Sequence, residues 1–352
     1  MTLQATDIAD VVTTTLNELG EMKFTDLMSD YQSTIALKRI MRKNKMTFRA
    51  GPEVQFNVIF DHNDSARFVG IGETDVVNIK NVMTTGKVPW RHITWNWSIE
   101  RREIAMNRSP RMIVDLTKTR RISSFGSAII KFEQALWKVP ATTDTKSPYG
   151  IPYYVVKSNT AATTANADGF NGLVPSGYTL VANLNPTTYP RWGNYATQYT
   201  VVSKADFVRK ARRMAEYTDW MPLVDEIPEY NTGDDYGQYT NYALLGALEE
   251  VLESQNDNLG TDLASMDGKV MLRRRPVTFV KELDLDTTNP FYSINWGEMK
   301  AMGLAGEWMN ETVIPIQPGQ HTISATHTDC TFNMFCRNRR RNGVLATNTG
   351  LP

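Results

Sequence analysis

The residues best suited to metal or acid–base chemistry are two histidines and two cysteines near the C-terminal end of the chain. His321, His327, Cys330 and Cys336 are separated by gaps of five, two and five residues. These gaps do not match the paired ligands of zinc sites. The two cysteines also share one face of a predicted strand with Phe332 and Met334, so we interpret them as core thiols. We expect no metal site here.

Other motifs of catalysis or cofactor binding are missing from the sequence. The polar run 256–258 lies next to Gly260, but for a calcium loop the glycine is one position off and the twelfth position has no glutamate. The phosphate-binding and dinucleotide-binding glycine motifs and the nucleophile elbow do not occur. Only four histidines are available for acid–base work. We therefore predict no catalytic residues, no cofactor and no enzymatic activity.

The composition favours a protein that associates with other proteins. Lysine plus arginine and aspartate plus glutamate each number 38, so the net charge is zero. A dedicated nucleic-acid binder usually has a basic excess, and zero net charge removes the long-range repulsion between copies. Two cysteines in 352 residues exclude a disulfide scaffold and fit a reducing compartment. With no signal-like N-terminus and no apolar run of 18 residues, we expect no membrane partner.

A long helix is the main element that the sequence predicts, between Ser109 and Lys138. Ser109 is a suitable cap, Pro110 fits the first turn, and Pro140 follows the end. Apolar residues recur at the helical period, at Ile113, Leu116, Phe125, Ile129, Phe132 and Leu136. Such a helix would be roughly 40 Å long. It is either a large amphipathic core helix or a spine on which sheets are mounted.

Two helices are expected before residue 50, at 6–20 and 24–44. The second ends in basic residues, Lys38, Arg39, Arg42, Lys43 and Lys45. Cations suit a helix C-terminus, so this end is either solvated or a patch that faces nucleic acid or an acidic partner.

Alternating apolar residues predict two strands, at 54–60 and 92–99, which we expect to pair as a long hairpin. The turn-rich stretch 61–75 lies between them. A two-stranded hairpin cannot bury both of its faces. It therefore packs on its own domain or on a neighbouring subunit.

The rest of the chain alternates between loop-rich and regular segments. Residues 141–200 are rich in threonine, asparagine and tyrosine, and we expect their aromatics to hold them in place as short strands or as an interface lining. Helices are expected at 203–217 and 240–255, and strands at 269–280 and 321–336. The last strand has apolar residues on both faces, which predicts a covered central strand. We expect Arg337–Arg341, which follow it, at the surface.

Several strings, spread from about residue 50 to the end, resemble those of one protein family. They are WRHITWNWSIE (90–100), YGIPYYVVKSN (149–159), GFNG (169–172), SKADFVRKAR (203–212), YTNYALLGALEEVLESQNDNLGTDLASMDG (239–268), NPFYSINWGEMK (289–300), LAGEWM (304–309) and CRNRRRNGVL (336–345). On these strings the chain resembles the major capsid proteins of tailed bacteriophages with the Hong Kong 97-type fold.

The resemblance implies an α+β fold with defined parts. These are an N-terminal arm (1–49), an extended E-loop hairpin (50–100), a peripheral domain (101–218) with spine helix 110–138 and inserted loops 141–200, an axial domain (219–318) and a return to the peripheral domain (319–352). The E-loop lies over an adjacent subunit in this family.

The implied function is structural: self-assembly into hexamers and pentamers of an icosahedral virion head around double-stranded DNA, which is held without sequence preference. The implied partners are further copies of the chain, a scaffolding protein and a portal; whether decoration proteins bind stays open. The N-terminal arm is too short for a built-in scaffolding segment, so a separate protein is implied. Lys80 and Lys87 lie in the E-loop, but nothing marks a matching asparagine or glutamate, so we expect non-covalent joining.

Two sets of residues are candidates for contacts in such a shell. The subunit-interface candidates are Trp90, Trp95, Trp97, Arg120 and Arg121, and for the tryptophans the alternative is packing within one subunit. The genome-facing candidates are Arg39, Arg42, Lys43, Arg339, Arg340 and Arg341. Two other functions stay open: a shell that encloses protein cargo, or a related intracellular enzyme. A glycan-binding fibre protein is a third, which the long helix disfavours.

Overall fold

The computed structural model describes residues 34–40, 46–63, 66–74, 77, 79–106, 110–157, 168–220, 235–256, 270–273, 275–314 and 322–347. The expected helix at 6–20 lies outside these residues, as do Arg42 and Lys43. Within 24–44, the described part is helix α2 (Ile35–Ile40).

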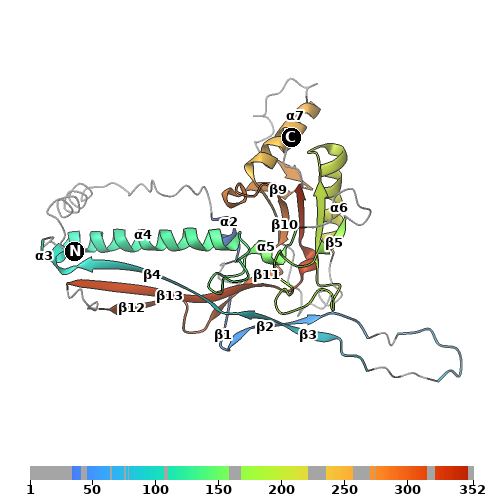
Figure 1. Cartoon of the computed structure of the whole chain (residues 1–352), viewed down its shortest axis with the longest axis horizontal. Helices are drawn as coiled ribbons and strands as arrows, with labels where there is room; N and C mark the ends of the chain where they lie inside the picture. Colours follow the sequence, from blue (N-terminus) through green and yellow to red (C-terminus); the bar gives the residue numbers. More distant parts are fainter. Residues whose placement is uncertain are drawn as a thin grey trace.

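The predicted long helix is confirmed as α4 (Pro110–Leu136), whose 27 residues span about 40 Å. It runs along one face of a long sheet and parallel to the strands of that sheet (Figure 1). Phe132 faces the sheet and contacts Trp95 and Phe332, with ring centroids 6.2 and 5.1 Å away. The helix therefore serves as a spine for the sheet, which decides between the two interpretations of its sequence.

The long sheet is built around β13 (Ile323–Cys336), which has 14 residues. Strand β4 (Arg91–Glu100) pairs along one edge of β13. Strands β12 (Asn310–Ile314) and β11 (Met299–Leu304) pair along the other edge, and β1 (Thr47–Arg49) extends the sheet beyond β11. From Cys330 onwards β13 is buried at every position, so the prediction of a covered central strand is confirmed.

A second sheet of seven strands stands beside the long sheet, with the order β5-β6-β14-β10-β7-β9-β8. Its strands are β5 (Gly169–Gly172), β6 (Asn194–Tyr199), β7 (Tyr236–Thr240), β8 (Met271–Leu272), β9 (Arg275–Phe279), β10 (Phe291–Asn295) and β14 (Gly343–Thr347). Helices α6 (Arg209–Thr218) and α7 (Tyr242–Asn256) pack against it and close a core around Phe207, Leu244 and Phe291. Both helices lie close to their predicted positions.

One continuous core joins the two sheets. At the end of α4, Trp137 packs against Tyr239 and Tyr292 of the second sheet, with centroids 5.6 and 6.2 Å away. The short helix α5 (Ile151–Tyr154) lies in the same core, and the Tyr154 hydroxyl donates to the Met334 carbonyl over 2.8 Å. Helix α3 (Arg101–Met106) leads from β4 to α4. Because aromatic residues fill the junction, the two sheets pack as one body.

Each of the two sheets takes its strands from several distant parts of the chain. Strands β11 and β12 fall within 219–318 but belong to the long sheet, whereas β14 falls within 319–352 but belongs to the second sheet. Strands β5 and β6, from the expected loop insert, also join the second sheet. Sequence order could not reveal this, because the chain crosses between the sheets several times.

The expected pairing of strands 54–60 and 92–99 is wrong. Strand β2 (Glu53–Ile59) pairs with β3 (Met83–Pro89), and β4 pairs with β13 instead. The predicted alternation along β4 is confirmed, because Trp95 is buried while Thr94 and Asn96 are exposed. Period-two alternation identifies the buried face of a strand but says nothing about the partner along its edge.

A buried carboxylate on the spine holds α2 in place. Glu133 accepts hydrogen bonds from the backbone N–H groups of Ile35, Ala36 and Leu37, over 2.9–3.1 Å, and from the indole N–H of Trp137. These backbone groups are the first amides of a helix, which have no partner within the helix itself. An anion here is favoured by both hydrogen bonding and the helix dipole. Glu133 therefore anchors the segment that leads into the body.

We predict that Glu133→Ala detaches α2 while leaving the two sheets folded. Loss of three charge-assisted hydrogen bonds should reduce hydrogen-exchange protection of the α2 amides by about 100-fold or more. Glu133→Gln keeps one acceptor oxygen and should lose about tenfold. Exchange measured by mass spectrometry on both variants tests this, with Glu250→Ala on the exposed face of α7 as the control. Unchanged protection of residues 35–40 would contradict the anchoring role.

The start of α6 depends on a second carboxylate. A single π-helical turn, η1 (Lys204–Val208), precedes α6. Asp206 in this turn accepts from the backbone N–H groups of Thr200 and Val201, over 2.8 and 3.1 Å, and pairs with Lys210 at 2.7 Å. Burial raises the pKa of Asp206, but these hydrogen bonds outweigh it and lower the pKa to about 2. The ionised form is therefore part of the fold.

We predict a corresponding pH dependence of stability. Because its folded-state pKa lies below the unfolded value of about 3.9, Asp206 contributes stability above about pH 4, and this is lost as the pH falls towards 2. Asp206→Asn should be less stable than the wild type at pH 6, and the difference should shrink as the pH falls below about 4. Urea unfolding at several pH values measures it. A difference that stays constant with pH would rule out this linkage.

Candidate assembly surfaces

The most exposed part of the described structure is the β2–β3 hairpin with its loop, residues 53–89, which we call the arm. It leaves the body at the lower right of Figure 1 and continues into a long loop. At its base, Phe56 stacks on Phe335 with a centroid distance of 5.2 Å. Gly86 makes room for this ring, because a Cβ atom there would lie 2.5 Å from Phe56 Cζ. The base of the arm is therefore fixed to the body.

Two ion pairs connect the strands of the arm. Lys87 pairs with Glu53 at 2.9 Å, and Lys80 pairs with Asp61 at 2.6 Å. The hydrogen bond from Lys80 lowers the pKa of Asp61, helped by the N–H of His62. Both lysines of the arm are thus engaged within the arm itself.

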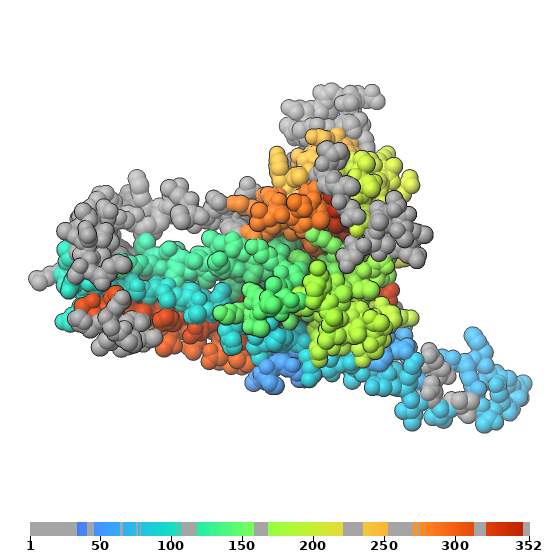
Figure 2. All heavy atoms as spheres, in the orientation of Figure 1, coloured from blue at the N-terminus to red at the C-terminus, as the bar shows by residue number. Residues whose placement is uncertain are grey.

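The end of the arm, residues 66–79, carries apolar side chains that no part of the described chain covers. Phe68, Ile71 and Ile79 are fully exposed, at 106%, 110% and 94%, and Val69 and Val77 are also exposed. In Figure 2 this loop stands clear of the body. Clusters of exposed apolar residues mark interaction sites, whereas isolated ones are ordinary. We call this segment the arm tip.

Trp90 directly follows the arm, and Trp95 and Trp97 lie on β4, so none of the three tryptophan candidates is on the arm tip. Trp95 is buried against Phe125 and Phe132 of α4, which favours packing within one subunit over the anchoring of a neighbour. Trp90 is half-buried, and its indole N–H donates to the Gly51 carbonyl over 2.8 Å. Trp97 is half-buried in a groove between β4 and α4. Trp90 and Trp97 keep enough exposure for a contact with another copy.

The two arginines of α4 make ion pairs within the chain. Arg120 binds both carboxylate oxygens of Glu103 at 2.7 Å and donates to the Ser98 carbonyl. This fork ties α3 and β4 to the spine. Arg121 pairs with Glu311 of β12 at 2.6 Å and remains half exposed. Arg121 is therefore the more accessible of the two interface candidates.

The expectation that all the basic residues after β13 lie at the surface is wrong. Arg339 and Arg341 are fully buried, and Arg341 pairs with buried Glu298 at 3.1 Å. They therefore cannot face a genome. Arg340 is partly exposed. Arg39 is also partly exposed and pairs with Asp235 at 2.9 Å.

The described residues offer little for covalent or metal chemistry. Cys330 and Cys336 are buried and unpaired, as predicted for core thiols. Burial raises the pKa of Cys330 to about 12, so its thiol stays protonated near neutral pH. Among the residues that the structure describes, no group of histidine, cysteine or acidic side chains is arranged to hold a metal ion, and no helix is long and apolar enough to span a membrane.

The fold is shared with phage capsid structures along nearly its whole length. No protein-family model and no curated protein matches the chain. A chain of the cyanophage A-1(L) capsid asymmetric unit is 13% identical, with 95% of this chain and 98% of that chain covered and a TM-score of 0.56. A structure from Microbacterium phage Oxtober96 is 11% identical, covers 96% and 98%, and has a TM-score of 0.53. The capsid of an empty GTA particle is 11% identical, covers 93% and 94%, and has a TM-score of 0.54.

These likenesses confirm the expected fold class. The chain has the α+β, Hong Kong 97-type fold of phage capsid proteins. Because the match extends over at least 93% of both chains in each case, it includes the spine, both sheets and the arm rather than one shared motif.

Proposed function

We propose that this protein is a structural shell subunit, the major capsid protein of a tailed phage, which assembles as hexamers and pentamers into an icosahedral head. The observation that carries the proposal is the end-to-end likeness to capsid chains at TM-scores of 0.53–0.56. A shell subunit needs no catalytic centre.

The arm supports this function independently. Its tip exposes five apolar side chains in one loop, which is unfavourable in an isolated protein. Burying a large apolar side chain contributes about 1.5–3 kcal/mol. A neighbouring copy in a closed shell would supply the missing surface, and every copy would both give and receive one arm.

The zero net charge fits a shell that encloses DNA better than a protein that binds DNA tightly. Phosphate contacts by lysine and arginine govern affinity for nucleic acid, and this chain has no basic excess. We propose that double-stranded DNA is enclosed without sequence preference, and that a scaffolding protein and a portal take part in assembly. Of the genome-facing candidates, Arg39 and Arg340 remain, together with Arg42 and Lys43, which lie outside the described residues.

The test is to express the chain alone and together with a scaffolding protein, and to examine the products by electron microscopy and size-exclusion chromatography. We expect closed shells, or hexameric and pentameric rings. Particles recovered from infected cells should contain double-stranded DNA that resists nuclease; protein cargo in its place would favour an enclosing compartment. A small monomer or trimer under both expression conditions would refute the proposal.

A further inference from the structure

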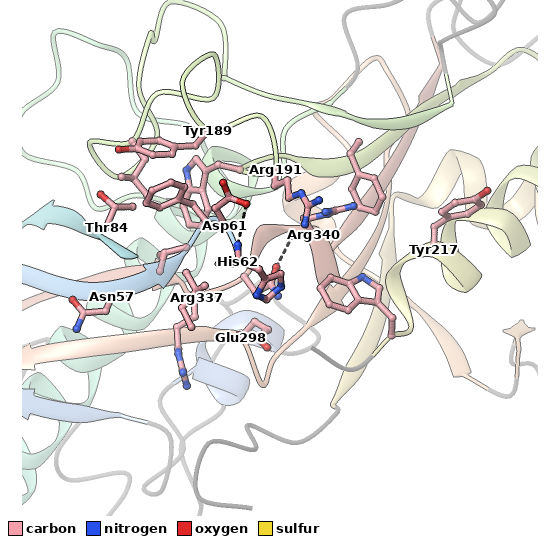
Figure 3. Close-up of a pocket in the computed structure, with 18 of the residues that line it drawn as sticks. Asn57, Asp61, His62, Thr84, Tyr189, Arg191, Tyr217, Glu298, Arg337 and Arg340 are labelled. Atoms are coloured by element: carbon pink, nitrogen blue, oxygen red, sulfur yellow. Dashed lines mark hydrogen bonds between the residues drawn. The ribbon is translucent and has the colours of Figure 1, made fainter. Parts of the chain in front are cut away.

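A cleft of about 700 Å³ lies where the arm leaves the body. It is bounded by the arm base (57–62), the loop before β6 (184–192), the end of α6 with Trp220, and the turn after β13 (337–340). Figure 3 shows the side chains of these four segments directed towards one space. Ligand pockets of proteins typically have volumes of this size. The proposed shell contacts of the arm tip do not involve it.

The walls of the cleft are largely aromatic. The rings that line it are Phe60, Phe170, Tyr189, Trp192, Tyr217 and Trp220. Phe60 meets Tyr189 edge to face at 4.9 Å, which closes the side towards the arm. Such walls favour apolar or planar groups of a ligand and exclude water from the charges beside them.

The three carboxylates that line the cleft are already neutralised. Asp61 pairs with Lys80, Glu216 with Arg273, and Glu298 with Arg341. These lysine and arginine partners do not line the cleft. These three carboxylates are therefore each balanced by an ion-pair partner outside the cleft, although the charge of Arg191 also helps to lower the pKa of Asp61.

Three arginines of the cleft have no such partner. Within the described part of the chain, no carboxylate lies within 4 Å of the guanidinium groups of Arg191, Arg337 or Arg340. Arg340 is stacked between Phe170 and Trp220, with distances of 4.2 and 5.8 Å to the ring centroids. Its Nε atom is buried and makes no hydrogen bond to the residues that the structure describes.

The positive charges of Arg191 and Arg340 repel each other in the free protein. Arg191 and Arg340 lie next to each other in Figure 3. Burial lowers the pKa of Arg340, and the neighbouring charge of Arg191 lowers it further. Like charges held together beside an aromatic wall are stabilised when an anion enters, because arginine forks bind carboxylates with two parallel hydrogen bonds.

We propose that this cleft binds an acidic peptide segment of a partner protein. Carboxylates of the peptide would meet Arg191, Arg337 and Arg340, and apolar side chains next to them would pack on the aromatic walls. Duplex DNA fits less well. Its bases are stacked inside the helix, and its convex phosphate backbone has no apolar or planar group that could pack on the aromatic walls. Since Phe60 and Asp61 belong to the arm base, an occupied cleft would also stabilise one direction of the arm.

The binding test uses a fluorescein-labelled peptide of alternating glutamate and leucine and follows its anisotropy with the full chain, unassembled and assembled. We expect saturable binding that weakens as salt is raised. The variant R191Q/R337Q removes the charges of the exposed Arg191 and the half-exposed Arg337, and it should weaken binding by about tenfold or more. R101Q/R102Q removes the same charge from exposed positions of α3 and should bind as the wild type. R340Q should also weaken binding, with thermal unfolding measured to check the fold.

Several outcomes would overturn the proposal. A glutamine–leucine peptide that binds equally well would show that charge has no role, and R191Q/R337Q binding as tightly as the wild type would exclude these arginines. Tighter binding of a duplex oligonucleotide, or full competition by inorganic phosphate at similar concentration, would assign the cleft to nucleic acid or to a free anion. Because the unassembled chain can be used, the result does not depend on shell formation.

Discussion

Replacing Arg339 by methionine is expected to destabilise the protein by about 3–5 kcal/mol, the loss typical of breaking a buried charged network. The guanidinium group is fully buried and donates to four backbone carbonyls and one side-chain amide oxygen. The acceptors are the carbonyls of Tyr154, Gly172, Leu173 and Trp192 and the Oδ1 atom of Asn194, at 2.7–3.3 Å. One side chain thus joins the turn after β13 to three separate parts of the 150–194 segment.

The stabilisation comes from the shape of the group as much as from its charge. Burial lowers the pKa of Arg339 to about 10, which still leaves it protonated at neutral pH. Its face also lies 5.7 Å from the ring centre of Trp192. A lysine has three donors on one atom and cannot reach acceptors on several sides. Arg339→Lys should therefore recover only part of the lost stability.

Chemical unfolding followed by tryptophan fluorescence measures both variants. The matched control is Arg209→Met on the exposed side of α6, which should change stability by less than about 0.5 kcal/mol. A loss below about 1 kcal/mol for Arg339→Met would mean that the 150–194 segment is held by its aromatic packing alone.

The Arg339 network was not predictable from the sequence. A run of cations after an apolar strand is usually solvated, so Arg337–Arg341 were expected at the surface. The burial of Arg339 depends on acceptor oxygens that lie 145–185 positions earlier in the chain. Local composition carries no signal for such a contact. Glu133 escaped prediction for the same reason, since the amides that it binds lie 96–98 residues away.

Elements determined by local chemistry were predicted well. Ser109, Pro110 and Pro140 bounded the spine to within a few residues, because caps and prolines act on adjacent backbone groups. The aromatic-rich segment 141–200 was expected to be held in place, and its Tyr153, Tyr154 and Trp192 are indeed buried around the short strands β5 and β6. The pairing partner of β4 was missed because it depends on topology.

The arm tip was hidden from prediction by its composition. Residues 61–75 contain glycine, asparagine and aspartate, which indicate turns, and Phe68 and Ile71 stand among them without periodicity. Trp95, whose large aromatic ring suggests a contact residue, belongs to the core. The available signal was the presence of large apolar residues in a stretch with no regular structure to bury them. An apolar residue in a turn-rich segment is a reason to look for a partner.

The second large effect is expected at this tip. Phe68→Asp/Ile71→Asp should abolish assembly into rings or shells while leaving the unfolding temperature of the subunit within about 1 °C of the wild type. Both side chains are fully exposed, so the folded subunit loses no buried contact. In an assembled shell the same change would remove about 3–6 kcal/mol per arm and place two charges at an apolar contact. Light scattering during assembly and electron microscopy of the products measure the effect.

The control must change the tip without changing its apolar surface, and Thr74→Asn does so at an exposed polar position of the same loop. It should assemble as the wild type. Because each subunit contributes one arm, a loss of even 3 kcal/mol per contact is multiplied around every ring, so partial assembly is not the expected result. Normal shells from the double aspartate variant would mean that the tip stays in solvent after assembly. In that case the exposed apolar residues would have to serve a partner other than a second copy of this chain.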